Sequence, residues 1–251
     1  MEVTEEATFL EKNGKSMIIY LRNYFRNKTL NLTVKSIRHF IPDADIRCLC
    51  FYDNHESEYN SLDKIENVNH IFYEKTQLKN NTDTNPETNN NEITSGSPGK
   101  RNLQIFTEGY NSIFNKVRGM DEKVLLLAED HFFTTGETLR ILSQSNYDLA
   151  YAQFGTGIRK NKNKKGSYYP NASILSFVPN SIEHLFPLPM TVRNDNDWGG
   201  AIESHLRSCL IDKIENKLLI RTRQHHNYHG DGVLTNNYKV IEKMLKESKI
   251  L

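Results

Sequence analysis

The sequence has few cysteines, no long apolar run and almost no net charge, and each shortage excludes a class of protein. Cys48, Cys50 and Cys209 are the only cysteines among 251 residues. So odd and sparse a set argues against a disulfide framework and for a reducing compartment. No stretch approaches the roughly 18 apolar residues that cross a bilayer, and residues 1–16 are too acidic and polar for a signal peptide. We therefore expect a cytoplasmic protein without a membrane span.

The charge balance is also informative about partners. The formal net charge is +1, so no bulk field favours nucleic acid or an anionic membrane. The basic run at 159–165 is local, which is typical of a solvated loop. We expect no nucleic-acid partner.

Short apolar runs alternate with helical patterns along the chain. Residues 17–21 predict a strand, 29–40 a helix that Pro42 ends, and 46–52 and 68–73 two further strands. A connection of this length between strands indicates a parallel crossover. Cys48 and Cys50 lie on the same face of the second strand, where we expect buried thiols.

The remaining segments continue the same alternation. We predict helices at 103–117, 133–143, 198–210 and 240–246, and strands at 123–128, 149–154, 173–177 and 218–221. Residues 123–128 are the most apolar strand and are therefore expected at the centre of the sheet. Residues 22–28 are expected to form a polar loop, and the Asn-rich stretch at 76–100 a mobile loop. The pattern predicts one Rossmann-like α/β domain over residues 1–251, with a mostly parallel central sheet flanked by helices.

Glu129, Asp130 and His131 directly follow the predicted central strand. In open parallel sheets, ligands bind outside the carboxyl ends of the strands. Carboxylates there are costly to bury without a partner, and carboxylate oxygens suit Mg²⁺ or Mn²⁺. The alternative is that the two acids enter solvent and cap the next helix. Two more polar clusters, at 195–198 and 225–232, follow later apolar elements, as the rim of one active site would.

Four short segments occur in the same order as motifs of a known family. They are 126–131 (LLAEDH), 195–198 (DNDW), 208–210 (SCL) and 229–232 (HGDG). They resemble motifs of GT-A glycosyltransferases, most closely those of the N-acetylglucosaminyltransferase II family. That family has Glu-Glu-Asp-His, where this chain has Ala128 in place of the first acid. It also has Asn-Trp-Asp-Trp, where this chain has Asn196 in place of the first tryptophan. Its members are membrane-anchored and cysteine-rich, whereas this chain has three cysteines and is expected to have no membrane span.

The resemblance implies an inverting, metal-dependent transfer of a sugar from a nucleotide-sugar to a saccharide hydroxyl. Asp130 and His229 would bind Mn²⁺ or Mg²⁺, Glu129 would lie near the ribose, and Asp197 would be the general base. A UDP-sugar donor is favoured, UDP-N-acetylglucosamine by analogy, and a GDP-sugar is the alternative.

Competing assignments remain open around these residues. Asp195 competes with Asp197 for the role of base, and Asp197 also suits an ordinary helix N-cap. His225 and His226 compete with His229 for the metal.

Further candidates for nucleotide binding come from the other predicted strand ends. Arg22 and Asn23 follow the first strand, and Asp53 follows the second, where an acid can accept a hydrogen bond from a base or ribose. Arg101 and Asn102 precede a predicted helix and are candidates for contact with the diphosphate. Each of these positions equally suits a solvent loop or a turn.

Two other functions fit the same pattern. A nucleotidyltransferase acting on sugar phosphates shares the fold and metal carboxylates, but it normally has a glycine-rich loop after the first strand, and residues 22–28 contain no glycine. The second alternative is a non-catalytic module that binds a carbohydrate or nucleotide.

Overall fold

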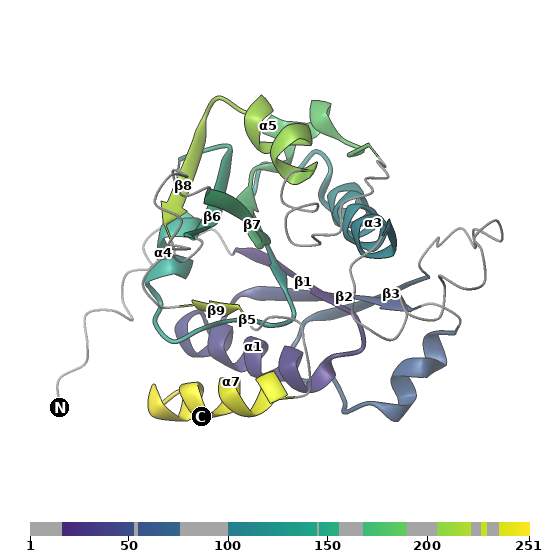
Figure 1. Cartoon of the computed structure of the whole chain (residues 1–251), viewed down its shortest axis with the longest axis vertical. Coiled ribbons are helices and arrows are strands. Elements are labelled where there is room, and N and C mark those ends of the chain that lie inside the picture. The colour runs from purple at the N-terminus through teal and green to yellow at the C-terminus, as the bar shows by residue number, and fades with distance from the viewer. Residues whose placement is uncertain are drawn as a thin grey trace, which may run out of the picture.

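The computed structural model describes residues 17–52, 55–75, 100–144, 146–155, 168–189, 205–221, 227–229 and 236–251. They form a seven-stranded sheet with helices on both faces and a separate two-stranded sheet (Figure 1). The large sheet has the strand order β3-β2-β1-β4-β7-β6-β8. Its strands are β1 (Ile18–Asn23), β2 (Asp45–Tyr52), β3 (His70–Lys75), β4 (Val124–Ala128), β6 (Leu149–Gly155), β7 (Tyr168–Phe177) and β8 (Lys217–Arg221).

Most neighbouring strands in this sheet are parallel. The pairs β1–β2, β2–β3 and β1–β4 are parallel, as is β6–β8, whereas β7 runs antiparallel to both β4 and β6. All five residues of β4 are buried, and β4 is the fourth strand of seven. The mixed α/β fold with a mostly parallel sheet is thus confirmed, and so is the central place of β4. The carboxyl ends of β1, β2, β3 and β4 meet at one edge, called here the carboxyl edge.

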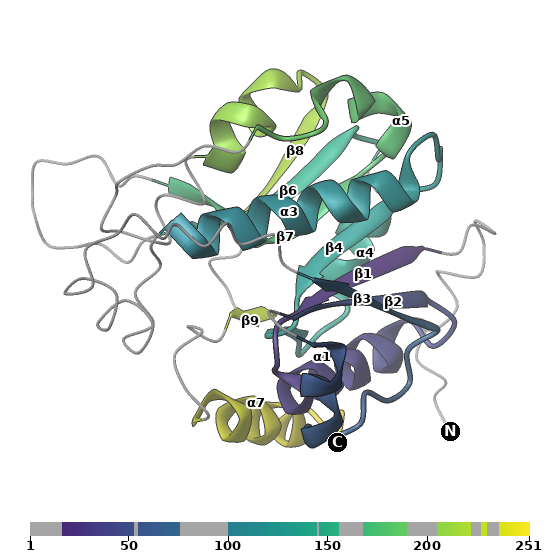
Figure 2. The same cartoon turned by 90° about the vertical axis from the view of Figure 1, so that its right-hand side faces the viewer.

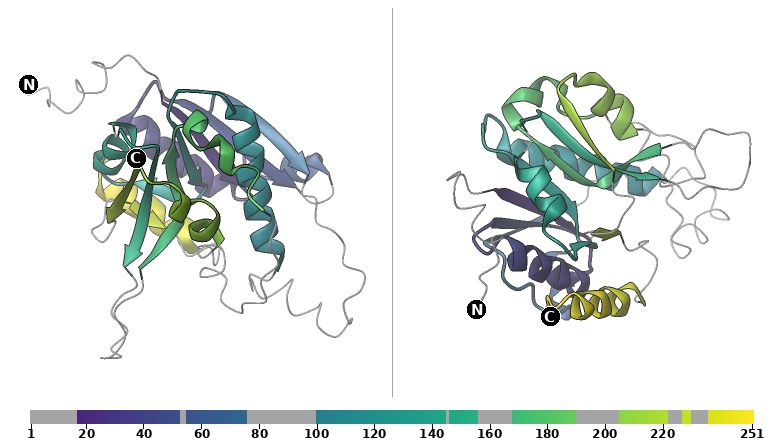
Figure 3. Two further views of the ribbon diagram at one scale, coloured as in Figure 1. Left: turned by 90° about the horizontal axis from the view of Figure 1, so that it is seen from above. Right: turned by 90° about the vertical axis from the view of Figure 1, so that its left-hand side faces the viewer.

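Helices bury both faces of the sheet because each carries one apolar stripe. On one face, α3 (Lys100–Val117) and α5 (Pro179–Ile182) pack over a core that includes Phe114 and Leu126. On the other, α1 (Asn27–Phe40) and α4 (Glu137–Gln144) pack over a core that includes Leu127. Figures 2 and 3 show these layers from the side and from above.

A second, smaller sheet lies against α1. Its strands β5 (His131–Phe133) and β9 (Asn227–His229) are antiparallel, and β5 follows the carboxyl end of β4 after two residues. Phe132 of β5 packs with Leu32 of α1 and with Ile241 and Leu245 of the closing helix α7 (Asn236–Glu247). Figure 1 shows this arrangement, with α1 and α7 side by side below the small sheet.

Several sequence predictions need correction in detail. Residues 22–28 are not one loop, because β1 continues through Asn23 and α1 begins at Asn27. The helix predicted at 133–143 begins only at Glu137, and Phe133 instead ends β5. Arg101 and Asn102 lie within the first turn of α3 rather than before it. The Asn-rich stretch at 76–99 lies outside the described residues.

The buried thiols are confirmed. Cys48 and Cys50 are free and fully buried, with their sulfur atoms 3.5 Å apart. Burial raises the pKa of the Cys48 thiol well above its usual value. Within the described residues, no helix is long and apolar enough to span a bilayer.

Candidate functional site

Two acidic side chains lie at the carboxyl edge, directly after β4. Glu129 and Asp130 form the turn between β4 and β5, and their side chains are only 12% and 6% exposed. Two adjacent carboxylates removed from water require nearby positive charge or hydrogen-bond donors. Glu129 and Asp130 are called here the acid pair, and the groups that contact them define the site.

Arg26 partners both acids. Its Nη1 atom lies 3.3 Å from Oδ2 of Asp130 and 3.4 Å from Oε1 of Glu129. The Arg26 side chain is 40% exposed and comes from the residue that precedes α1. Because the Arg26 guanidinium is partly hydrated, its ion pairs with the two acids contribute less to stability than fully buried ion pairs would. The contact nevertheless shows that the acid pair attracts a cation at the carboxyl edge.

The electrostatics of Glu129 combine opposing effects. Burial raises the pKa of Glu129, and the neighbouring charge of Asp130 raises it further, while the Arg26 and Arg22 guanidinium groups lower it. The net direction is upward. Additional positive charge at this turn would therefore favour the ionised acid pair.

Hydroxyl groups of α1 fix the backbone of the acid turn. Thr33 donates a hydrogen bond of 2.7 Å from Oγ1 to the carbonyl oxygen of Glu129. Ser36 accepts one of 3.2 Å from the Phe133 amide and donates one of 2.7 Å to the Thr33 carbonyl oxygen. Both residues are fully buried, so these bonds attach the start and end of the β4–β5 segment to one helix.

Thr33→Val is expected to lower the free energy of unfolding by about 1–3 kcal/mol. Valine keeps the shape of threonine but cannot donate to the Glu129 carbonyl, which then remains buried without this partner. Chemical denaturation measures the change. Ser143→Ala is the control, because the Ser143 hydroxyl donates a similar 2.8 Å bond to Arg140 at an exposed position. Equal effects of the two substitutions would contradict the role of Thr33.

The loop from β1 to α1 is held by side chains from three segments. Asn23 is buried, donates to Oδ1 of Asn27 at 2.7 Å, and accepts from the Arg26 amide at 3.1 Å. Tyr59, from the 3-10 helix η2 (Glu56–Ser61), donates to the Phe51 carbonyl at 2.7 Å and accepts from the Phe25 amide at 3.3 Å. Asn23 thus has a structural role in this loop, and its predicted contact with a nucleotide stays a prediction.

Phe25 adopts an unusual backbone conformation next to Arg26. Its φ is +58°, in the left-handed region that bulky residues rarely occupy. Its ring stacks on Tyr59, with centroids 4.7 Å apart. Strained residues of this kind persist where the surroundings hold them, often at ligand sites. The conformation places Arg26 immediately before α1, within reach of the acid pair.

Arg22 lies at the end of β1 and contacts α3. Its guanidinium carbon is 5.1 Å from the centre of the Tyr110 ring, a cation–π arrangement. Gly109 allows this approach, since a Cβ there would lie 3.2 Å from the Phe51 ring and 3.4 Å from Cδ of Arg22. Arg22 therefore adds positive charge to the carboxyl edge between β1 and α3.

The small sheet brings the two predicted metal ligands close in the backbone. In the β5–β9 pairing, His229 is the partner of His131, and Asp130 is the residue immediately before His131. Asp130 and His229 are 99 positions apart in sequence, and their backbones come close only because β9 pairs with β5. For His229 the structure describes the backbone only, so the binding of a metal by its imidazole stays a prediction.

The acid pair suits a hard divalent ion. Carboxylate oxygens are ligands that Mn²⁺ and Mg²⁺ accept, and the Arg26 guanidinium lies against these same oxygens. Among the side chains that the structure describes, no group of three His, Cys, Asp or Glu residues is arranged to hold a metal ion. Water and substrate phosphates commonly complete the shell of such ions.

Other predicted site residues lie outside the described residues. They are Asp53, Asp195, Asp197, His225 and His226. The backbone of Arg101 is in the first turn of α3, and its proposed contact with the diphosphate remains a prediction.

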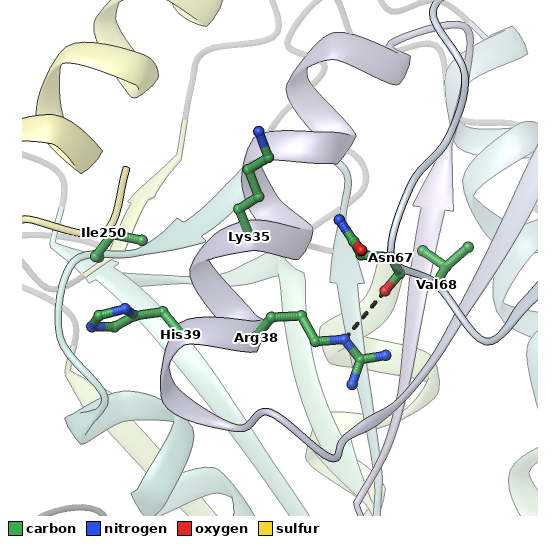
Figure 4. A pocket seen from close by; sticks show the side chains of 6 residues that line it. All are labelled: Lys35, Arg38, His39, Asn67, Val68 and Ile250. Atoms are coloured by element: carbon green, nitrogen blue, oxygen red, sulfur yellow. Dashed lines mark hydrogen bonds between the residues drawn. The ribbon is translucent and has the colours of Figure 1, made fainter.

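A cavity of about 640 Å³ lies elsewhere, near the end of α1 and the start of β3 (Figure 4). It is therefore toward the amino ends of the strands, away from the acid pair. Arg38, its central cation, has hydrogen bonds to the carbonyl oxygens of Asn67, Pro42 and Ala44 and to Oδ1 of Asn69. Arg38 thus joins α1 to the loops before β2 and β3, and this cavity is not the candidate site.

Comparison with known proteins identifies the fold. No protein-family model and no curated protein matches this chain. Among solved structures, the galactosyltransferase LgtC in complex with donor and acceptor sugar analogs matches with a TM-score of 0.52 and 13% identity, over 94% of this chain and 96% of that one. A candidate glucose-1-phosphate thymidylyltransferase from Bacillus anthracis, in complex with sucrose, matches with a TM-score of 0.50 and 8% identity, over 92% and 96%.

The chain has the GT-A fold. At these identities the likeness establishes the fold alone. The two matched structures are a glycosyltransferase and a candidate nucleotidyltransferase. The narrower resemblance to the N-acetylglucosaminyltransferase II family gains no support from these comparisons. In this GT-A fold, the acid pair follows the central strand β4 at the carboxyl edge, where open α/β sheets bind ligands.

Sequence reasoning missed three contributors to the site: Arg26, Thr33 and Tyr59. The sequence pattern predicts a polar loop around Arg26, although an arginine just before a helix at the carboxyl edge can reach acids that follow a neighbouring strand. Thr33 was detectable as a polar residue on the apolar face of α1, between Leu30 and Val34. Tyr59 gave no local signal, because its partners lie 8 and 34 residues away.

Proposed function

We propose that this protein is an inverting, metal-dependent glycosyltransferase that moves a sugar from a nucleotide-sugar to a saccharide hydroxyl. The observation that carries the proposal is the buried acid pair after the central strand of a GT-A fold, already holding a cationic group. The return of β9 to β5, which brings the backbone of His229 next to Asp130, adds support.

The chain's residues would divide the work as follows. Asp130 and His229 would hold Mn²⁺ or Mg²⁺, which when bound neutralises charge on the leaving diphosphate. Glu129 would bind the ribose, and Arg22 adds positive charge nearby. Asp197 would accept the proton of the acceptor hydroxyl, whose oxygen forms the new bond to the anomeric carbon as the bond to the diphosphate oxygen breaks. Asp53 and Arg101 remain further candidates for donor binding.

A nucleotidyltransferase is the second candidate, and the β1–α1 loop speaks against it. Residues 24–26 are Tyr, Phe and Arg, and the bulky Phe25 is fixed against Tyr59. A loop that cradles a triphosphate usually exposes backbone N–H groups of glycines, which approach the phosphates closely.

The donor is proposed as a UDP-sugar, with N-acetylglucosamine supported only by the sequence resemblance.

A thermal-shift experiment with nucleotide-sugars tests this function. At a concentration 100 times its Kd, a donor that binds only the folded chain adds about 2.7 kcal/mol, which is about 5–10 °C in Tm for a chain of this size. We expect this rise for a UDP-sugar with Mn²⁺ and little rise when EDTA replaces Mn²⁺. Nucleotide release is then followed with saccharide acceptors. Pyrophosphate release from a nucleoside triphosphate and a sugar 1-phosphate, without sugar transfer, would favour the nucleotidyltransferase.

A further inference from the structure

Arg26 occupies the position of a cation between the two acids. A single nitrogen, Nη1, lies almost equally far from Oδ2 of Asp130 and Oε1 of Glu129, at 3.3 and 3.4 Å. The two carboxylates carry a formal charge of −2, and Arg26 reduces the charge of the three groups to −1. A divalent ion that approaches Asp130 therefore meets a guanidinium group already in contact with the same carboxylate.

The arginine can leave this position more easily than the acids can. Its side chain is 40% exposed, whereas those of Glu129 and Asp130 are 12% and 6% exposed. Moving a partly hydrated guanidinium further into water has a small cost, whereas two nearly buried carboxylates need positive charge close by. The contact is thus stable in the absence of another cation and replaceable in its presence.

The location of Arg26 suits a second role once it is displaced. It lies on the β1–α1 loop at the carboxyl edge, the same edge as Arg22 and the acid pair. A guanidinium group matches two oxygens of a phosphate through parallel hydrogen bonds, and it stays charged at all physiological pH values. A diphosphate bound beside Asp130 would lie close to this side chain, which already contacts the Asp130 carboxylate.

We propose that Arg26 is an internal cation that a divalent metal displaces from the acid pair, and that the displaced guanidinium then binds the diphosphate of the donor. The proposal rests on the proposed function, since it requires metal and diphosphate at this edge. It predicts that the same arginine opposes binding of the metal alone and supports binding of the nucleotide once metal is present.

Arg26→Gln separates the two effects in the full chain. Mn²⁺ binding without nucleotide is measured by electron paramagnetic resonance of free Mn²⁺, and UDP binding at saturating Mn²⁺ by calorimetry. We expect Arg26→Gln to bind Mn²⁺ at least about fivefold more tightly than the original chain and UDP at least about fivefold more weakly, the lower end of typical coupling between two ligands. Arg26→Lys, which keeps the charge, should bind Mn²⁺ much as the original chain does.

Arg118→Gln is the matched control. Arg118 is 49% exposed and forms an ion pair of 3.4 Å with Glu183, away from the acid pair, so its loss should change neither affinity. Arg26→Met provides a second neutral variant of similar length if the glutamine variant folds poorly. Unchanged or weaker Mn²⁺ binding in the neutral variants would overturn the displacement, and unchanged UDP binding would overturn the role with the diphosphate.

Asp130→Asn keeps this test distinct from that of the function itself. If Asp130→Asn abolishes Mn²⁺ binding while the Arg26 variants match the original chain, the metal site stands and the proposal for Arg26 fails. If Asp130→Asn binds Mn²⁺ as well as the original chain does, the proposed metal site fails, and the proposal for Arg26 fails with it.

Discussion

Asp130→Asn is expected to lower kcat for sugar transfer by about 10³-fold, with the protein still folded. A metal ion contributes several kcal/mol to stabilising transition-state charge, and each 1.4 kcal/mol corresponds to about tenfold in rate. Asparagine has nearly the same shape as aspartate but supplies one neutral oxygen, so the ion would be held poorly. Steady-state transfer assays at saturating donor and acceptor, with Mn²⁺ varied, measure the change.

Asp121→Asn is the control for this prediction. Asp121 precedes the same strand β4 at its opposite end, where its carboxylate accepts a 3.0 Å bond from Asn180 at an exposed position. An asparagine there should leave kcat and the Mn²⁺ requirement unchanged. Near-normal transfer by Asp130→Asn would show that the acid pair is not the metal site.

Asp197→Asn is expected to lower kcat by about 10²–10⁴-fold, the usual contribution of a positioned general base. The KM for the donor should change little, because the base acts on the acceptor hydroxyl rather than on the nucleotide. Mn²⁺ affinity should also stay the same, which distinguishes this variant from Asp130→Asn. The measurement is the transfer rate at saturating donor, with Mn²⁺ binding determined on the same sample.

Asp195→Asn resolves the competing assignment of the base. The two aspartates are separated only by Asn196, so both variants change the same charge in the same short segment. If Asp197 is the base, Asp195→Asn should retain transfer within a few-fold of the original chain. A reversed pattern would assign the base to Asp195, and full activity in both variants would exclude this segment from the chemistry.

The sequence predicts most of the large sheet because its strands carry local apolar signals, although β7 begins at Tyr168, five residues before the strand predicted at 173–177. Residues 124–128 are apolar without interruption, and the strand they form is fully buried in the middle of the sheet. The end of β1 is less predictable. Arg22 and Asn23 are polar, yet they continue the strand because they pair in register with Leu49 and Cys50 of β2.

The small sheet could not be predicted from a local pattern. His131, Phe132 and Phe133 are too few to show a strand period, and their partner strand begins 94 residues after Phe133. The same segment reads equally well as the start of the following helix. The bridge by Arg26 has a similar origin, because its ion pair with Asp130 joins residues 104 positions apart. Placing Asp130 at the site needed only its position after the central strand, whereas identifying its partners needed the folded chain.

A crystal structure with Mn²⁺ and UDP tests the central claim most directly. The anomalous signal of manganese locates the ion without assumptions about its ligands. The account predicts an anomalous peak in contact with the Asp130 carboxylate and with oxygens of both phosphates, at the carboxyl end of β4. A manganese ion bound to UDP at another place, with the Asp130 carboxylate still in contact with Arg26 and not with the ion, would contradict it.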